Sequence, residues 1–399
     1  MNQEVVILSA ARTPIGSFLG SLKHLKAPKL GAITIEEALK RSHIPRELVD
    51  ECLMGCVLTA GVGQAPARQA TLFAGLPPSV CATTINRVCG SGLKTIMLAS
   101  QILQCGDARV VIAGGMESMS NSPYLLAKAR EGYKMGPEKL IDSMILDGLW
   151  DVYHDFHMGN AAELCVKEKS FSREAQDAFS KKSYERAISS IQSKLFEDEI
   201  VPVNITPPKS TESLYLSQDE EPMRVNFERF AHLKPVFDKQ GTITAANSSS
   251  LSDGASALVL TTAKAAQEFV SSYGSKPLAR VVAHASFATA PEWFTIAPVG
   301  AIQKLLKIAN LSIDAIDYFE INEAFAVVAL ACMKELGLSD ERVNIKGGAV
   351  ALGHPIGASG SRIVTTLLYT LIQKKARYGI ATACIGGGEA SAILIERCV

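Results

Sequence analysis

The feature of this 399-residue sequence that most constrains its fold is a weak internal repeat. Ser91, in a Gly-Ser-Gly triplet, precedes an apolar helical pattern, and Ser359, in an Ala-Ser-Gly triplet, does the same 268 positions later. Ala108 and Ala376 open a second pair of similar segments with the same offset. A constant offset across two features predicts two copies of one structural unit. Chance similarity between small-residue helix starts is the alternative reading.

Apolar, β-branched runs alternate with longer helical patterns along the chain, which predicts an α/β fold with covered sheets. The predicted strands are residues 5–8, 110–113, 258–261, 280–285, 318–321, 379–383 and 392–395. The predicted helices are residues 91–104, 173–191, 263–272, 299–309, 324–336 and 361–374. Between about 120 and 249 the pattern changes to a Gly- and Pro-containing stretch with one polar helix, which predicts an inserted, loop-rich segment.

Composition excludes several classes of protein. Hydrophobic residues make up 47% of the chain and charged residues 20%, so a large core is expected. Lys plus Arg and Asp plus Glu both number 40, which argues against nucleic-acid binding. Neither a signal peptide nor a membrane span is recognised. The nine cysteines are too irregular for a disulfide framework, and Cys52 and Cys56 lack metal-site spacing. A cytoplasmic protein without a metal is expected.

Cys89 lies between a strand-like run and a helix start, in the sequence Val-Cys-Gly-Ser-Gly. Helix N-termini carry unpaired N–H groups and the positive end of the dipole, which favour a thiolate. The sequence therefore offers Cys89 as a nucleophile. A small buried hydrophobe is the alternative reading.

His354 lies in a segment with five glycines, residues 347–360, that leads into another apolar helix. Under the repeat, Gly357 corresponds to Cys89, so the two helix starts are expected to face each other. His354 would then activate Cys89 as a general base. A structural histidine in a tight turn is the alternative.

Two further segments offer polar groups for chemistry. Cys384 ends a predicted strand and is followed by Ile385 and three glycines, whose N–H groups would suit a developing oxyanion. Asn322, before the predicted helix at 324–336, is expected to be its N-cap. A buried cysteine before a glycine turn is the alternative for Cys384.

These four segments, in this order, closely resemble the motifs of the thiolase family, and the resemblance runs from near residue 5 to the chain end. Residues 11–16, 114–120 and 252–255 also resemble family motifs. The resemblance implies two pseudo-symmetric, layered α/β core domains with an inserted loop domain. The implied domains are residues 1–120 with 250–272, residues 121–249, and residues 273–399.

The resemblance also implies the catalytic roles for a reversible Claisen condensation. Cys89 would take the acetyl group, and His354 would activate it and help to bind the thioester oxygen. Cys384 would remove or return the α-proton. Asn322 would hold a water that completes one oxyanion hole with His354, and the N–H groups of Cys89 and Gly386 would form the other.

Similarity to the short-chain branch of the family implies the conversion of two acetyl-CoA to acetoacetyl-CoA and CoA, in either direction. The implied substrate and CoA contacts are His157, Met158, Phe237, Ser249, Phe294, Phe325 and Arg224. A helix-start role for His157 and a solvated surface position for Arg224 are the alternatives.

No cofactor is expected, because coenzyme A is a substrate. Potassium-activated relatives carry a tyrosine after the acidic run, where this chain has Pro222 and Met223, so potassium activation is left open. The family also implies a homo-oligomer, a dimer of dimers joined through residues 121–136.

Three rival interpretations remain: a degradative 3-ketoacyl-CoA thiolase of broader range, a ketoacyl synthase, and a catalytically dead CoA-binding module. Cys384 and its glycines favour thiolase over synthase, and no GxSxG segment suggests a serine hydrolase.

Overall fold

The computed structural model describes residues 3–206 and 212–398; residues 1–2, 207–211 and 399, which the predicted domain ranges include, lie outside that description. The helices are α1 Ala27–Ser42, α2 Pro66–Phe73, α3 Ser91–Cys105, α4 Ser143–Gly148, α5 Met158–Lys169, α6 Arg173–Gln192, α7 Ala263–Tyr273, α8 Ala297–Ala309, α9 Ala326–Leu336, α10 Ala349–Leu352 and α11 Ile356–Lys374. The main strands are β1 Val5–Arg12, β2 Gly16–Ser17, β3 Glu51–Gly55, β4 Cys81–Ile85, β5 Val110–Ser118, β12 Ser252–Thr262, β13 Ala279–Ala288, β14 Tyr318–Ile321, β15 Tyr378–Ile385 and β16 Glu389–Arg397.

Nine of these strands follow one another in a continuous sheet, in the order β14-β15-β16-β13-β1-β12-β5-β3-β4, and β2 pairs with β12. The two halves meet where β1 pairs antiparallel with β13 over three residue pairs. Strands β1, β5 and β12 are buried along their whole length. Burial on both faces explains why these strands read as continuous apolar runs rather than alternating ones.

The repeat predicted from the sequence is visible in the strand pairing. In the first half β5 pairs parallel with β3 and antiparallel with β12. In the second half β15 pairs parallel with β14 and antiparallel with β16. The α/β fold with two similar core units is therefore confirmed.

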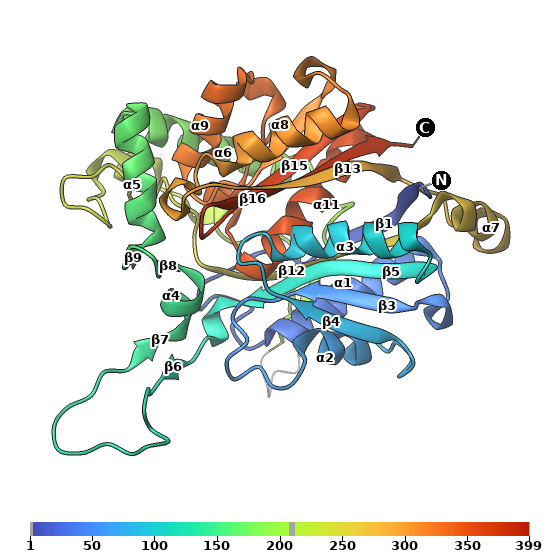
Figure 1. Ribbon diagram of the computed structural model, residues 1–399, viewed down its shortest axis with the longest axis horizontal. Helices are drawn as coiled ribbons and strands as arrows, with labels where there is room; N and C mark the ends of the chain where they lie inside the picture. The colour runs from blue at the N-terminus through green and yellow to red at the C-terminus, as the bar shows by residue number, and fades with distance from the viewer. Residues whose placement is uncertain (1–2, 207–211, 399) are drawn as a thin grey trace.

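Helices and the two halves of the sheet alternate in five layers: helices, sheet, helices, sheet, helices (Figure 1). Helices α1 and α2 lie against the first half, α8 and α9 lie on the far side of the second half, and α3 and α11 lie between the halves. Every residue of α11 from 356 to 371 is buried. A helix that is buried on all sides belongs to the middle of a layered protein.

Glycines bring α3 and α11 into backbone contact. A Cβ atom on Gly92 would lie 2.7 Å from the backbone N of Ser361, and one on Gly360 would lie 2.2 Å from the backbone N of Leu93. The small residues that suggested the repeat therefore have a packing role. Helix α11 begins at Ile356, earlier than the predicted start at 361.

The insertion holds α4, α5 and α6 and three short strand pairs. The pairs are β6 Tyr124–Leu125 with β7 Ile141–Asp142, β8 Trp150–Asp151 with β9 Phe156–His157, and β10 Val203–Asn204 with β11 Tyr215–Leu216. Figure 1 shows the connection between β6 and β7 extending away from the body of the molecule. The described residues contain no helix long and apolar enough to cross a membrane.

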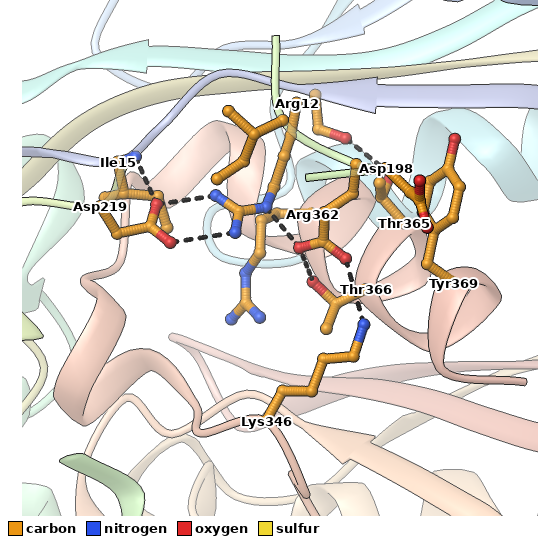
Figure 2. A network of polar contacts seen from close by, with 12 residues as sticks. Arg12, Ile15, Asp198, Asp219, Lys346, Arg362, Thr365, Thr366 and Tyr369 are labelled. Atoms are coloured by element: carbon orange, nitrogen blue, oxygen red, sulfur yellow. Dashed lines mark hydrogen bonds and ion pairs between the residues drawn. The ribbon is translucent and has the colours of Figure 1, made fainter. Parts of the chain in front are cut away.

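A buried ionic network joins β1, the insertion and α11 (Figure 2). Arg12 is fully buried; its Nε donates to Glu199 Oε1 at 2.6 Å, and its Nη1 and Nη2 donate to Asp219 at 2.7 and 3.0 Å. Thr366 of α11 donates to Glu199. Arg362 points into the same region, with its Nη1 3.6 Å from Glu320 Oε2. Removing one member of such a buried network leaves its partners unpaired, which is costly.

Candidate active site

The two halves and the insertion together enclose a cavity of ≈ 540 Å³. Its lining includes these residues predicted from the sequence: Cys89, His157, Met158, Phe237, Ser249, Phe294, Phe325, His354 and Gly386. Asn322 and Cys384 are buried and do not themselves line the cavity. Asn322 contacts His354, and Cys384 interacts electrostatically with Cys89. A groove of ≈ 590 Å³ beside the end of α6 contains none of the predicted site residues.

Cys89 lies in a strained turn just before α3. The preceding residue, Val88, has φ 44, which is rare for a β-branched side chain. Asn86 Oδ1 accepts the Val88 N–H at 3.0 Å, and Ser91 Oγ donates to the Val88 carbonyl at 2.7 Å. Such strain persists only where surrounding contacts hold it, and it is common at functional sites.

The Cys89 thiol is not activated in the resting protein. Burial raises its pKa to about 11, against the opposing effect of the N–H groups of Gly386 and of Cys89 itself. The expectation that the helix start alone would favour the thiolate is therefore wrong, because desolvation outweighs the N–H groups. A base has to take the proton, and the two N–H groups predicted for an oxyanion hole do converge on this sulfur.

His354 lines the same cavity as Cys89 and is the candidate for that base. Burial, and then the charge of Arg362, lowers its pKa to about 3, so the imidazole is neutral at physiological pH. Ser359 Oγ donates to the Pro355 carbonyl at 3.0 Å, so it accepts from His354 Nδ1. This arrangement assigns the proton to Nδ1 and leaves Nε2 as the acceptor.

Asn322 contacts the histidine rather than capping a helix. Helix α9 begins at Ala326 with Phe325 at its N-cap position, so the predicted cap is wrong. Asn322 Nδ2 lies 3.3 Å from His354 Nε2, and its buried Oδ1 has no protein partner. A buried amide oxygen without a protein partner is suited to binding an ordered water.

Cys384 lies near the end of β15 and is 1% exposed. Burial raises the pKa of its thiol, and the charge of Cys89 raises it further, which places the two sulfurs close enough to interact. Gly387 and Gly388, with φ 89 and 81, make the turn into β16 that left-handed backbone allows. The turn leaves the Gly386 N–H directed at Cys89.

Aromatic rings line the cavity beside the insertion. His157 stacks on Phe237 with ring centroids 4.6 Å apart, and Phe325 packs edge-on against Phe237 and close to Phe294. The His157 Nδ1 also accepts the Gly159 N–H at 3.0 Å, so His157 caps α5 as well as lining the cavity. Because Nδ1 is an acceptor, the Nε2–H remains available as a donor.

Arg224 is not among the cavity residues. It lies in a short 3₁₀ helix, Pro222–Arg224, where it donates to Ser17 and Glu220. Its side chain is 56% exposed. The position agrees with the surface alternative.

Several residues of the site were missed in the sequence. Ser359 fixes the His354 tautomer, and its place five residues after the histidine at a helix start was the available signal. Met119, Met144, Leu149 and Tyr184 also line the cavity. No local pattern identifies them, because their segments meet only in the folded chain.

The chain matches the thiolase N-terminal domain over residues 5–264 and the thiolase C-terminal domain over residues 275–397. It is 51% identical over 397 residues to an acetyl-CoA acetyltransferase of Schizosaccharomyces pombe, with all of both chains covered. It is 54% identical over 395 residues to a mitochondrial acetyl-CoA acetyltransferase of Xenopus tropicalis, covering 99% of this chain and 92% of that protein.

Solved structures give the same result. The fold is similar to that of Acat5 thiolase from Ascaris suum in complex with coenzyme A, with a TM-score of 0.93, 44% identity, and coverage of 99% and 100% of the two chains. It is also similar to a Bacillus anthracis acetyl-CoA acetyltransferase, with a TM-score of 0.96, 39% identity and full coverage of both chains. The chain belongs to the thiolase family.

Proposed function

We propose that this protein is an acetyl-CoA C-acetyltransferase that interconverts two acetyl-CoA with acetoacetyl-CoA and CoA. The observation that carries the proposal is the arrangement at Cys89: two N–H groups converge on its sulfur in a cavity that it shares with a neutral histidine. The names of the full-length relatives support the same activity.

In the thiolytic direction His354 Nε2 takes the Cys89 proton, and the sulfur attacks the ketone carbon of acetoacetyl-CoA. The N–H groups of Cys89 and Gly386 bind the oxyanion that forms. Preorganised donors of this kind are worth about 3–4 kcal/mol each. Cleavage of the C–C bond leaves an acetyl group on Cys89 and an acetyl-CoA enolate.

The enolate oxygen is bound by His354, now protonated at Nε2, and by a water held on Asn322. Cys384 donates its proton to the enolate carbon, which releases acetyl-CoA. The raised pKa of the Cys384 thiol keeps that proton in place until the enolate forms. CoA then gives its thiol proton to Cys384 and attacks acetyl-Cys89, which completes the second acetyl-CoA. His354 returns its proton to the released Cys89 sulfur, which restores the enzyme.

The rings of Phe237, Phe294 and Phe325 pack against one another and line the cavity together with Met158, which supports a short acyl group. A degradative thiolase of broader range would need room there for a longer chain. Arg224 stays a proposed contact for the CoA phosphates, supported only by its partial exposure near Glu221, a lining residue.

The experiment is thiolysis of acetoacetyl-CoA by the pure protein with CoA, compared with a long 3-ketoacyl-CoA. We expect rapid turnover of the short substrate, weak turnover of the long one, and loss of activity in Cys89→Ala. Cys105→Ala is the matched control, because Cys105 is exposed at the other end of α3. Equal long-chain turnover would favour the degradative thiolase, and no turnover at all would favour the dead CoA-binding module.

Three further properties rest on the sequence. We propose a dimer of dimers, supported by the exposed Leu126, Met135 and Leu140 of the β6–β7 connection, for which the mass in solution is the test. A cytoplasmic location is proposed from the sequence alone. No cofactor is proposed, and comparing the rate in potassium and sodium salts tests whether Pro222 is compatible with activation.

A further inference from the structure

The thiolase-like segment 114–120 contains a fully buried carboxylate, Glu117, to which the mechanism above gives no part. Its Oε2 accepts the N–H of Val57 at 3.0 Å and of Gly357 at 2.9 Å, and its Oε1 accepts the N–H of Leu58 at 3.1 Å. The Cys56 thiol is 3.6 Å from Oε1. One side chain therefore joins the loop after β3 to the first turn of α11.

The packing around this carboxylate depends on glycines. A Cβ atom on Gly115 would lie 2.1 Å from the Gly357 carbonyl oxygen, and one on Gly55 would lie 2.7 Å from the same oxygen. A Cβ atom on Gly357 itself would lie 2.8 Å from Glu117 Oε2. The backbones of β3, β5 and α11 thus meet at one point, where the Glu117 carboxylate accepts three backbone N–H groups.

The two joined segments carry the catalytic pair. Val57 and Leu58 form a small apolar cluster with Met119, Met144 and Ile356, against which Cys89 packs. Gly357 is three residues after His354, in the helix whose N-terminus favours a negative charge. Through its hydrogen bonds, Glu117 therefore links the turn that holds His354 to the apolar cluster against which Cys89 packs.

Glu117 also acts on the nucleophile through its charge. Burial is the main cause of the raised Cys89 pKa, and the negative charge of Glu117 adds to it in the same direction. Removing that charge while keeping the size of the side chain should lower the Cys89 pKa. Burial raises the pKa of Glu117 itself to about 7, so its charge is fully present at the alkaline pH where Cys89 titrates.

We propose that Glu117 is a positioning residue for acyl transfer, which fixes the Cys89 and His354 segments relative to each other; this inference rests on the proposed function. In Glu117→Gln an amide nitrogen replaces one acceptor oxygen, so some of the backbone N–H groups lose their partner. A small misplacement of reacting groups costs much of the rate. The effect should therefore appear in kcat rather than in the KM for acetoacetyl-CoA.

The test measures kcat, KM and the pH dependence of iodoacetamide alkylation of Cys89 in the wild type, Glu117→Gln and Glu117→Asp. For Glu117→Gln we expect kcat to fall by about 10- to 100-fold, KM to stay within about 2-fold, and the alkylation midpoint to move to lower pH. Glu117→Asp keeps the charge, so its alkylation midpoint should stay near that of the wild type even if the shorter side chain lowers kcat.

Asp50→Asn is the matched control. Asp50 Oδ2 accepts the N–H groups of Arg109 and Val110 at 2.7 and 3.0 Å, at the opposite end of β5. An unchanged alkylation midpoint in Glu117→Gln, or an equal loss of kcat in Asp50→Asn, would overturn the inference.

The alkylation measurement needs no turnover, so it remains decisive if the wild type fails the thiolysis assay. Glu117→Asp serves in its place if the Gln variant does not fold, since a wild-type kcat and KM there would contradict a demand for exact placement.

Discussion

At the scale of single residues, Cys89 and His354 are both uncharged in the resting protein. With a Cys89 pKa of about 11 and a His354 pKa of about 3, both groups are neutral in the resting protein. An ion pair in this buried site would carry a large desolvation cost unless a substrate accompanied it. At neutral pH we therefore expect charge on this pair only when a substrate carbonyl is present to accept the sulfur.

This state has a consequence for stability at low pH. The folded-state pKa of His354 lies below its ordinary value of 6.5, so between about 6.5 and 3 the unfolded chain binds a proton that the native protein does not. The resulting loss of folding stability is absent above pH 6.5 and grows as the pH falls towards 3. At pH 4.5, two units below 6.5, this effect destabilises the wild type by about 2–3 kcal/mol.

His354→Asn removes this effect. We expect the variant to gain about 2–3 kcal/mol relative to the wild type on moving from pH 7 to pH 4.5, measured by urea unfolding at both pH values. Comparing the two proteins cancels the titration of the other buried acids, Glu117 and Glu320. A difference in unfolding free energy that does not change with pH would show that His354 titrates normally.

Sequence patterns identified the residues that carry a local signature, and missed those that act at long range. Cys89, His354 and Gly386 lie in glycine-rich segments that a reader can find without a structure. Glu117 binds a residue 240 positions away, so nothing nearby shows its role. Asn322 contacts His354. It was wrongly predicted as a helix cap, because the chain continues to Phe325 before turning into α9.

At the scale of elements, strands that contain a long apolar run were the ones that could be predicted. Strands β5 and β12 are buried on both faces, and their apolar parts, residues 110–113 and 258–261, were predicted. Strand β4 lies at the edge of the sheet with no residue buried in the single chain, and it was missed. Its sequence, Cys-Ala-Thr-Thr-Ile, lacks the apolar run on which such predictions depend.

The contact between α3 and α11 can be tested at one atom. Gly360→Ala gains up to about 1 kcal/mol of helix propensity, but it places a Cβ 2.2 Å from the backbone N of Leu93. Overpacking against backbone typically costs about 1–3 kcal/mol and occasionally more. Because the contact is with backbone, we take the upper end of that range, about 3 kcal/mol, and expect a net loss of about 2 kcal/mol in urea unfolding.

Gly254→Ala in β12 is the control for that substitution. Its nearest neighbour would be a side-chain atom, Pro355 Cγ, at 3.3 Å, which can shift slightly. The control should lose much less stability than Gly360→Ala. Equal losses would mean that the two helices do not meet as closely as described.

At the scale of the whole molecule, the buried network around Arg12 holds the first strand, the insertion and α11 together. Arg12→Met leaves Glu199 and Asp219 buried without their partner, and we expect a loss of about 3–5 kcal/mol. Arg109→Met breaks an exposed pair with Glu268 and should change stability little. Thermal and urea unfolding of both variants make the comparison, and similar small effects would show that the network is not needed.

Helix α11 completes a layer whose other helix, α3, comes from the first half of the chain. During synthesis on the ribosome the N-terminal repeat is exposed long before residue 356 is made. Until then the inner face of its sheet, which α11 shares with α3, is only half covered, and apolar strands left open in this way favour aggregation. Because α11 is translated last among the long helices, we expect both repeats to become stable only when it has been made. Chains truncated before α11 should therefore depend on chaperones.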